Sequence, residues 1–205
     1  MTLEVIFKKW RTILISFLVF TNIIAFFLIV KYLMPFQNPS EIIADKEAYE
    51  RIGLLRWEDG INHPLPQDFA DMLGWKEMAE KALVAYKMIP ADELQNTLIY
   101  CDNYGQAGAL NYYNRNKTPE AYSFNTDYIY WLPKKIKLQN MLFVGELPKK
   151  EVINMFEDYK LVGVVENEFS REKGTEIFLF LGAKNSATEM FYKIAEERKK
   201  NFEIF

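Results

Sequence analysis

The chain has 205 residues, half of them hydrophobic and 16% aromatic, so it is unlike a disordered protein and has enough apolar side chains to bury a core. Residues 1–34 carry four basic side chains and one acidic one, whereas the rest of the chain carries 21 basic and 27 acidic ones. The acidic remainder argues against a nucleic-acid partner, because a phosphate backbone requires a basic surface. One histidine and one cysteine exclude an intrachain disulfide and a multi-histidine or multi-cysteine metal site, and no cofactor is expected.

The segment 12–34 is predicted to be a transmembrane helix. Its first 19 residues, Thr12–Val30, contain no charged side chain, and about 20 apolar residues are needed to cross a hydrocarbon core. Trp10 and Tyr32 lie at its two ends, where interfacial aromatic residues are enriched. The alternatives are a buried core helix and a cleaved signal peptide. A signal peptide would have a shorter apolar run and small residues at a cleavage site, which KYLMPFQNPSE lacks.

The basic side chains around this segment predict its orientation. Lys8, Lys9 and Arg11 precede the apolar run, and only Lys31 follows it closely. Because basic residues are retained on the cytoplasmic side, residues 1–11 are expected in the cytoplasm and the C-terminal domain in the periplasm or outside the cell. The sequence therefore indicates a single-pass protein of the cell (inner) membrane, with a signal-anchor helix and the lipid bilayer as its first partner.

A proline-containing connector, residues 35–66, is expected to follow the membrane segment. It carries four prolines and mixed charge, and one short helix is predicted over Ser40–Arg51, with Ser40 as a possible N-cap. His63 lies in this connector between an asparagine and a proline, where a structural or exposed role is the expectation. The extracytoplasmic domain is predicted to occupy residues 67–205.

Within that domain, apolar segments alternate with segments of helical periodicity. Continuous apolar strands, rather than alternating ones, predict an α/β fold with a mostly parallel or mixed sheet flanked by helices, in which TLIYC, NMLFVG and EIFLFL are the inner strands. The expected helices are Asp71–Ile89, one opening after Asp102, Pro148–Tyr159 and Ala187–Lys200, and the expected strands are Thr97–Cys101, 121–124, 128–132, Asn140–Gly145, Leu161–Val165 and Glu176–Leu181.

A candidate ligand site lies where the first strand gives way to a helix, in the segment Asp102–Ala109 (DNYGQAGA). Free amides at a helix start can hold a ligand, and glycines permit a close approach of the backbone. The alternative is that the glycines only allow tight packing of helix on sheet, and neither a Walker loop nor a G-x-G-x-x-G motif is present. The residues assigned to this site are Asp102, Asn103, Gly105, Gln106 and Gly108, bordered by Gln67 and Trp75 of the segment Leu65–Trp75.

Three other features of the sequence are candidate sites. Asp68 and Asp71, three residues apart, are a possible carboxylate pair, although helix capping by Asp71 is the simpler role. Cys101 is expected to be a buried small hydrophobe. The aromatic stretch Tyr122–Trp131 suits either stacking on sugar rings or packing in the core. No set of residues forms a catalytic constellation, so no catalytic residue and no metal ligand are assigned.

Two stretches resemble a known family: LPQDFADMLGW (65–75) and, after a helix and a proline, LIYCDNYGQAGALNYY (98–113). Together with the later order of strands and helix, they resemble the C-terminal extracytoplasmic part of bacterial glycosyltransferase family 39 membrane proteins, relatives of dolichyl-phosphate-mannose protein mannosyltransferases and of lipid-A aminoarabinose transferases. The resemblance covers about residues 12–205.

Members of that family carry their catalytic acid and lipid-phosphate-sugar site on a bundle of transmembrane helices, of which this chain has the equivalent of the last only. The resemblance therefore implies an accessory or substrate-recognition module that works with a membrane glycosyltransferase and recognises a glycan or a lipid-linked sugar, and that is not an enzyme on its own. The alternatives are a truncated glycosyltransferase gene product without independent activity and a stand-alone membrane-tethered enzyme that uses Asp68, Asp71 or Asp102.

Overall fold

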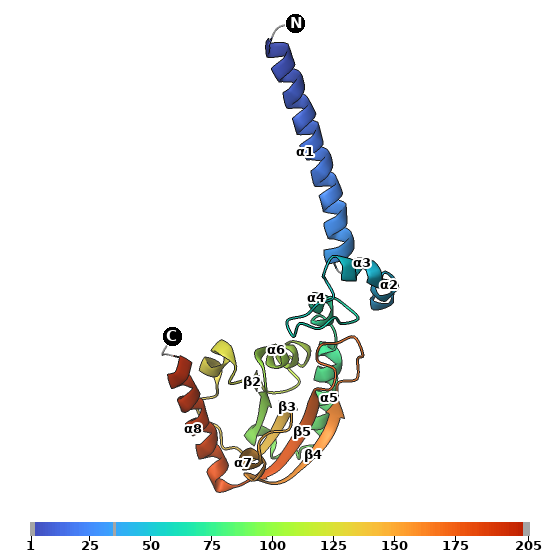
Figure 1. Cartoon of the computed structure of the whole chain (residues 1–205). Coiled ribbons are helices and arrows are strands. Elements are labelled where there is room, and N and C mark those ends of the chain that lie inside the picture. The colour runs from blue at the N-terminus through green and yellow to red at the C-terminus, as the bar shows by residue number, and fades with distance from the viewer. Residues whose placement is uncertain (1–2, 35, 203–205) are drawn as a thin grey trace. The chain divides into compact units, whose positions relative to one another are not determined.

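The computed structural model describes residues 3–34 and 36–202, which divide into two compact units, Met1–Phe69 and Ala70–Phe205. The first unit contains the long helix α1 (Leu3–Leu33), shown in Figure 1. Its Trp10–Leu33 portion is long and apolar enough to cross a membrane, and the most apolar 18-residue stretch of this portion has no buried residue. An exposed apolar surface of this extent is what a lipid-facing helix presents and what a core helix does not.

After α1, the first unit has two short helices where the sequence predicted one. They are α2 (Pro39–Ala44) and α3 (Lys46–Arg51), separated by Asp45. The predicted cap, Ser40, is wrong: the N-cap of α2 is Asn38, because Pro39 is already helical and the cap must precede it. The Asn38 side chain accepts a hydrogen bond from the Glu41 backbone N–H (3.0 Å), and the Glu41 carboxylate accepts one from the Asn38 N–H (2.8 Å).

These short helices pack at the end of α1. The Lys31 ammonium lies 2.8 Å from the Asp45 carboxylate, and the Tyr49 hydroxyl donates to the Gln37 side-chain oxygen (2.5 Å). Tyr49 is fully buried, with its ring edge-to-face against Tyr32. Farther along, His63 stacks on Trp57 at a ring separation of 3.7 Å, in agreement with a structural role. Helix α4 (Gln67–Ala70) ends this region.

The second unit is built on a five-stranded mixed sheet of order β2-β1-β3-β5-β4. Strand β1 pairs in parallel with β2 and β3, whereas β5 pairs antiparallel with β3 and β4. The predicted α/β fold is confirmed, and the three predicted inner strands are β1, β3 and β5. The strands are β1 (Thr97–Cys101), β2 (Ala121–Tyr122), β3 (Asn140–Gly145), β4 (Phe156–Val164) and β5 (Glu176–Ala183).

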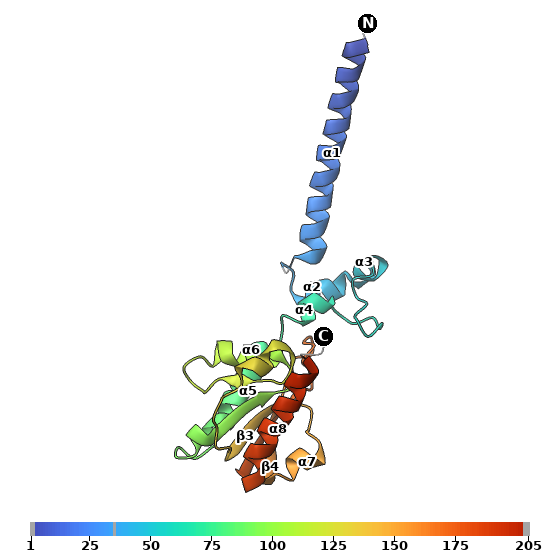
Figure 2. The same cartoon turned by 90° about the vertical axis from the view of Figure 1, so that its left-hand side faces the viewer.

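Helices cover both faces of this sheet (Figure 2), which is why every residue of its central strand β3 is buried. On one face, α5 (Trp75–Lys87) and α6 (Tyr104–Tyr113) pack over side chains such as Ile99 and Leu142. On the other face, α8 (Asn185–Phe202) and the one-turn α7 (Lys150–Ile153) pack over side chains such as Met141 and Phe143.

Three local predictions are wrong. The helix expected over Pro148–Tyr159 stops at Ile153, because the chain from Phe156 onward pairs with β5 as an edge strand. The strand expected over 128–132 is instead the 3₁₀-helix η2 (Thr126–Trp131), in which Ile129 is fully buried while Trp131 is exposed. The structure also has another 3₁₀-helix, η1 (Leu94–Asn96), directly before β1.

The third concerns the start of α5. This helix begins at Trp75 rather than Asp71, after Gly74 in a left-handed conformation (φ 84°) that a residue with a side chain rarely adopts. Asp71 is therefore not the N-cap of α5, and its carboxylate lies 3.4 Å from the Arg171 guanidinium.

Candidate functional site

The amino end of α6, where the ligand site was predicted, is closed by its own side chains. Asn103 caps the helix by accepting a hydrogen bond from the Gln106 backbone N–H (2.9 Å), and the Gln106 side-chain oxygen accepts one from the Asn103 N–H (3.4 Å). Gln106 is buried, and its side-chain amide donates to the Glu172 carboxylate (2.9 Å). The Gln106 side chain and the Asn103 side-chain oxygen, both expected to meet a ligand, therefore already have partners within the protein.

The two glycines of this segment lie under aromatic side chains. A Cβ at Gly105 would lie 3.2 Å from the Trp75 ring, and one at Gly108 would lie 3.3 Å from the Tyr128 hydroxyl. These contacts agree with the packing alternative for the glycines. Gln67 belongs to the first unit, where its side-chain oxygen accepts a hydrogen bond from the Glu58 N–H (3.0 Å).

The aspartates proposed for an enzyme have different partners. Asp102, at the carboxyl end of β1, accepts a hydrogen bond from the Glu146 backbone N–H (3.2 Å). Burial raises the pKa of the Asp102 carboxyl, and the nearby Glu146 carboxylate adds to the rise. Asp71 pairs with Arg171, and Asp68 lies in α4 of the first unit. Among residues 3–34 and 36–202 there is no group of three or more histidine, cysteine or acidic side chains placed to hold a metal.

Cys101 fits its expected role as a small hydrophobe. It is fully buried at the end of β1, and burial raises the pKa of its thiol well above the usual range. An unreactive thiol of this kind serves packing rather than nucleophilic chemistry.

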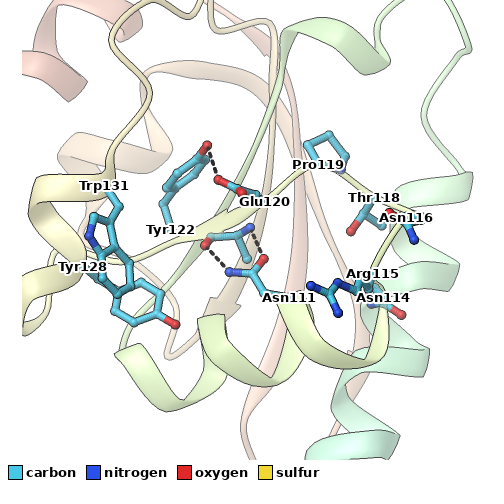
Figure 3. A pocket seen from close by; sticks show the side chains of 11 residues that line it. Asn111, Asn114, Arg115, Asn116, Thr118, Pro119, Glu120, Tyr122, Tyr128 and Trp131 are labelled. Carbon is cyan, nitrogen blue, oxygen red and sulfur yellow. Dashed lines mark hydrogen bonds between the residues drawn. The ribbon is translucent and has the colours of Figure 1, made fainter.

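An open cavity of about 560 Å³ lies at the opposite, carboxyl end of α6 (Figure 3). Its size lies within the range of small-ligand pockets, which is roughly 300–1,000 Å³. Three segments form it: the end of α6 with the loop that follows, the short strand β2, and the 3₁₀-helix η2. The lining residues are Asn111, Asn114, Arg115, Asn116, Thr118, Pro119, Glu120, Ala121, Tyr122, Tyr128 and Trp131.

One wall of this cavity is aromatic. Trp131 is 61% exposed, and its ring lies beside the ring of Tyr128 with centroids 4.6 Å apart. Figure 3 shows this pair facing the cavity from η2. Tyr122 adds a third ring, and its hydroxyl donates to the Glu120 carboxylate (3.4 Å). The pKa of Tyr122 is raised, first by burial and then by Glu120.

The floor of the cavity is held by two asparagines. The Asn111 amide donates to the Ala121 carbonyl (3.0 Å) and accepts from the Ala121 N–H (2.7 Å), so it joins α6 to β2 in place of a backbone ladder. Asn114 is buried and donates to the Ala79 carbonyl of α5 (2.8 Å). The loop that joins the end of α6 to β2 is therefore fixed at both of its ends, which favours a preformed site.

The rim of the cavity is polar and has no net charge. Arg115, Asn116 and Glu120 are exposed, and within the described part of the chain Arg115 forms no ion pair. The carboxyl end of a helix also carries a partial negative charge, which disfavours an anion there. The cavity therefore has an aromatic wall on one side and, on the other, a rim with neutral amides, one cation and one anion. This combination suits an uncharged ligand with many hydroxyls, whose ring carbons stack on the aromatic faces while its hydroxyls form hydrogen bonds with the rim.

A second cavity, of about 420 Å³, lies between the sheet and α8. Its lining is largely apolar, including Phe124, Phe143 and Phe191, and it reaches Asp102 and the exposed Arg198. Its hydrogen-bonding groups are mostly charged, so it is a poorer match than the first cavity for an uncharged ligand rich in hydroxyls.

Sequence reasoning identified part of the first cavity. The aromatic stretch Tyr122–Trp131 was a candidate for sugar stacking, and three of its rings line the cavity. The polar lining residues that were not predicted lie in the last turn of α6 or in the loop after it: Asn111, Asn114, Arg115, Asn116, Thr118 and Glu120. Their signal in the sequence is the run NYYNRN, which places three asparagines within six residues directly after an apolar helical segment.

Comparison of the chain with models of protein families, with curated proteins and with solved structures finds no match. The features of the chain that bear on its function are therefore the residues of the cavity, the apolar helix α1 and the two stretches that resemble family 39 glycosyltransferases.

Proposed function

We propose that this chain is a membrane-anchored extracytoplasmic recognition module that binds a glycan, or the saccharide part of a lipid-linked sugar, in the cavity at the carboxyl end of α6. The observation that carries this proposal is the pairing of the exposed Trp131–Tyr128 wall with a polar rim of no net charge. The resemblance to family 39 glycosyltransferases supports an accessory role beside a membrane glycosyltransferase, which would supply the catalytic groups.

The binding experiment uses the full chain in detergent micelles or lipid nanodiscs. Titration with neutral oligosaccharides, followed by amide shifts in NMR spectra, is expected to move resonances of the loop 114–120 and of η2. Trp131→Ala is expected to weaken binding about tenfold, because a stacked aromatic face is lost. The matched control is Tyr130→Ala, which removes an exposed ring of the same 3₁₀-helix that does not line the cavity.

Two outcomes would reject the glycan proposal. Equal losses in Trp131→Ala and Tyr130→Ala would place binding outside the cavity, and shifts confined to Asn103–Gly108 would return the site to the amino end of α6. Sugar phosphates form a separate arm of the titration: the neutral rim predicts that they bind no more tightly than the corresponding free sugars.

The membrane part of the proposal is supported by the exposed apolar surface of α1 and the basic side chains before it. An alkaline-phosphatase fusion at the C-terminus is expected to be active, and a reporter that works only in the cytoplasm is expected to be silent. The reverse pattern would place the folded domain in the cytoplasm and reject the proposed topology.

The alternative of a stand-alone enzyme has one observation in its favour, the raised pKa of Asp102 beside the second cavity. Asp71 pairs with Arg171 and does not line that cavity, whereas the Glu146 carboxylate does lie near Asp102 there. The alternative of a truncated gene product is tested by the DNA upstream: an adjacent reading frame for a transmembrane bundle would indicate a split or interrupted glycosyltransferase.

A further inference from the structure

The apolar surface of α1 is interrupted near its centre by one exposed amide, Asn22. It lies 12 residues after Trp10 and 11 before Leu33, the two ends of the membrane-length portion. At 1.5 Å per residue, about 17 Å of helix separates Asn22 from either end. The side chain is too short to reach the interface, so in a membrane it lies at the depth where a polar group has the least access to water.

The hydrogen-bonding capacity of Asn22 exceeds what α1 itself supplies. Its side-chain nitrogen donates to the Leu18 carbonyl one turn earlier (2.8 Å), which accounts for one of two N–H donors. Among residues 3–34 and 36–202 no other hydrogen bond is formed by this side chain, so its second N–H and its carbonyl oxygen face outward. The neighbouring Thr21 differs, because its single hydroxyl proton is already donated to the Leu18 carbonyl (2.9 Å).

The helix surface is hollowed at the same place. The short Asn22 side chain leaves a shallow groove on α1 between larger apolar side chains, which are Leu18, Val19, Ile23, Phe26 and Phe27. A groove of this kind accepts side chains of a second helix, so that apolar packing and the amide contact are formed together.

We infer that α1 pairs in the membrane with α1 of a second copy of this chain, through reciprocal hydrogen bonds between the two Asn22 side chains. The inference depends on the proposed membrane insertion. The second copy is the occupant that the chemistry favours, because two copies share one orientation and place Asn22 at the same depth. Across a two-fold axis, the N–H of each amide then meets the carbonyl oxygen of the other, and neither amide is left unpaired in hydrocarbon.

The test is disulfide cross-linking of the full chain in native membranes. Single cysteines replace Val19 or Phe26 on the groove, and matched controls replace Phe17 or Leu28, which lie on the opposite side of the helix at 3.6 residues per turn. Cys101 stays in place, because it is fully buried. Oxidation is expected to give dimers from Val19→Cys and Phe26→Cys, and little from the two controls.

The deciding variants add Asn22→Leu or Asn22→Gln to the Phe26→Cys chain. Asn22→Leu is expected to weaken self-association about tenfold, as for the loss of an interhelical hydrogen-bond pair, whereas Asn22→Gln retains donor and acceptor and is expected to preserve dimers. Undiminished cross-linking in Asn22→Leu, or cross-linking only to a different protein, would overturn the inference.

Resistance to alkaline extraction separates this inference from the proposed function. If the chain is extracted from the membrane, the anchor itself is wrong. If the chain remains integral but forms no dimer, only the pairing through Asn22 is wrong, and glycan binding by the second unit is unaffected.

Discussion

The two ends of α6 are both rich in polar side chains, yet they use them differently. At the amino end, Asn103 and Gln106 pair with each other and with Glu172, and the glycines lie against Trp75 and Tyr128. At the carboxyl end, two asparagines fix the backbone and leave the side chains of the following loop exposed around a cavity. Polar side chains are free to contact a ligand only where the structural hydrogen bonds of their segment are made by other groups.

The largest effect is expected from a change in the packed region at the amino end. Gly145 ends β3 with φ 147°, and a Cβ there would lie 2.5 Å from the Asp102 carboxylate. Gly145→Ala combines backbone strain with this overlap, so we expect a loss of about 3 kcal/mol in the free energy of unfolding. Urea unfolding in micelles measures it. Gly174→Ala, also at positive φ but in open space, is the control and should lose less.

An unchanged stability in Gly145→Ala would show that Asp102 moves away without cost. The region would then be a loosely filled turn rather than a packed one, and the contrast between the two ends of α6 would disappear.

The next effect is expected at the floor of the cavity. Asn111→Leu removes both hydrogen bonds to Ala121 and leaves a buried N–H and carbonyl unpaired, so we expect a loss of about 2 kcal/mol. Glycan binding should also weaken, because β2 is released from α6. Asn116→Gly keeps the left-handed backbone of that residue (φ 63°) and is expected to leave stability nearly unchanged. Full stability in Asn111→Leu would mean that the cavity is not preformed.

A smaller effect separates stability from binding. Asn103→Ala removes the N-cap of α6, and we expect a loss of about 1 kcal/mol in the free energy of unfolding. Glycan affinity, measured by the same titration as for Trp131→Ala, should not change, because Asn103 does not line the cavity. A loss of affinity without a loss of stability would show that Asn103 contacts the ligand, in favour of the site predicted from the sequence.

The sequence was informative where one residue pattern allows one structure. Residues 98–101 of β1 and 141–145 of β3 are apolar at successive positions, which favours strands buried on both faces, and both strands have the predicted bounds. The pattern was ambiguous where a few buried residues anchor an exposed segment. The segment 128–132 contains aromatic residues typical of a strand, but only Ile129 is buried, and one buried contact does not distinguish a strand from a 3₁₀-helix.

The candidate site could be predicted only in part for a related reason. The aromatic rings were visible in the sequence, but their partners come from a loop whose position depends on two long-range bonds, from Asn114 to Ala79 and from Asn111 to Ala121. Conversely, the capping box at Asn103 and Gln106 has the same residue types as a ligand site, and only their mutual hydrogen bonds show that they are occupied.

The smallest effect tests the electrostatics of the amino end through Asp102. Burial, and then the Glu146 carboxylate, hold the pKa of Asp102 above its usual value, so the folded protein binds this proton more tightly than the unfolded chain does. The stabilising contribution of the carboxyl group is therefore fully present at pH values below its usual pKa and is lost as the pH rises through the raised pKa.

The variant Asp102→Asn is uncharged at every pH, and its side-chain oxygen can still accept the hydrogen bond from the Glu146 N–H. We expect the variant to be slightly more stable than the parent chain at pH 7, with the difference shrinking below about pH 4. Thermal unfolding at the two pH values measures this, with the exposed Glu120→Gln as a control for the loss of a surface charge. If the variant is less stable than the parent at pH 7, the ionised carboxylate is stabilised by Arg198. The amino end of α6 would then hold a charged group that a ligand could contact, and it would not be a closed and packed turn.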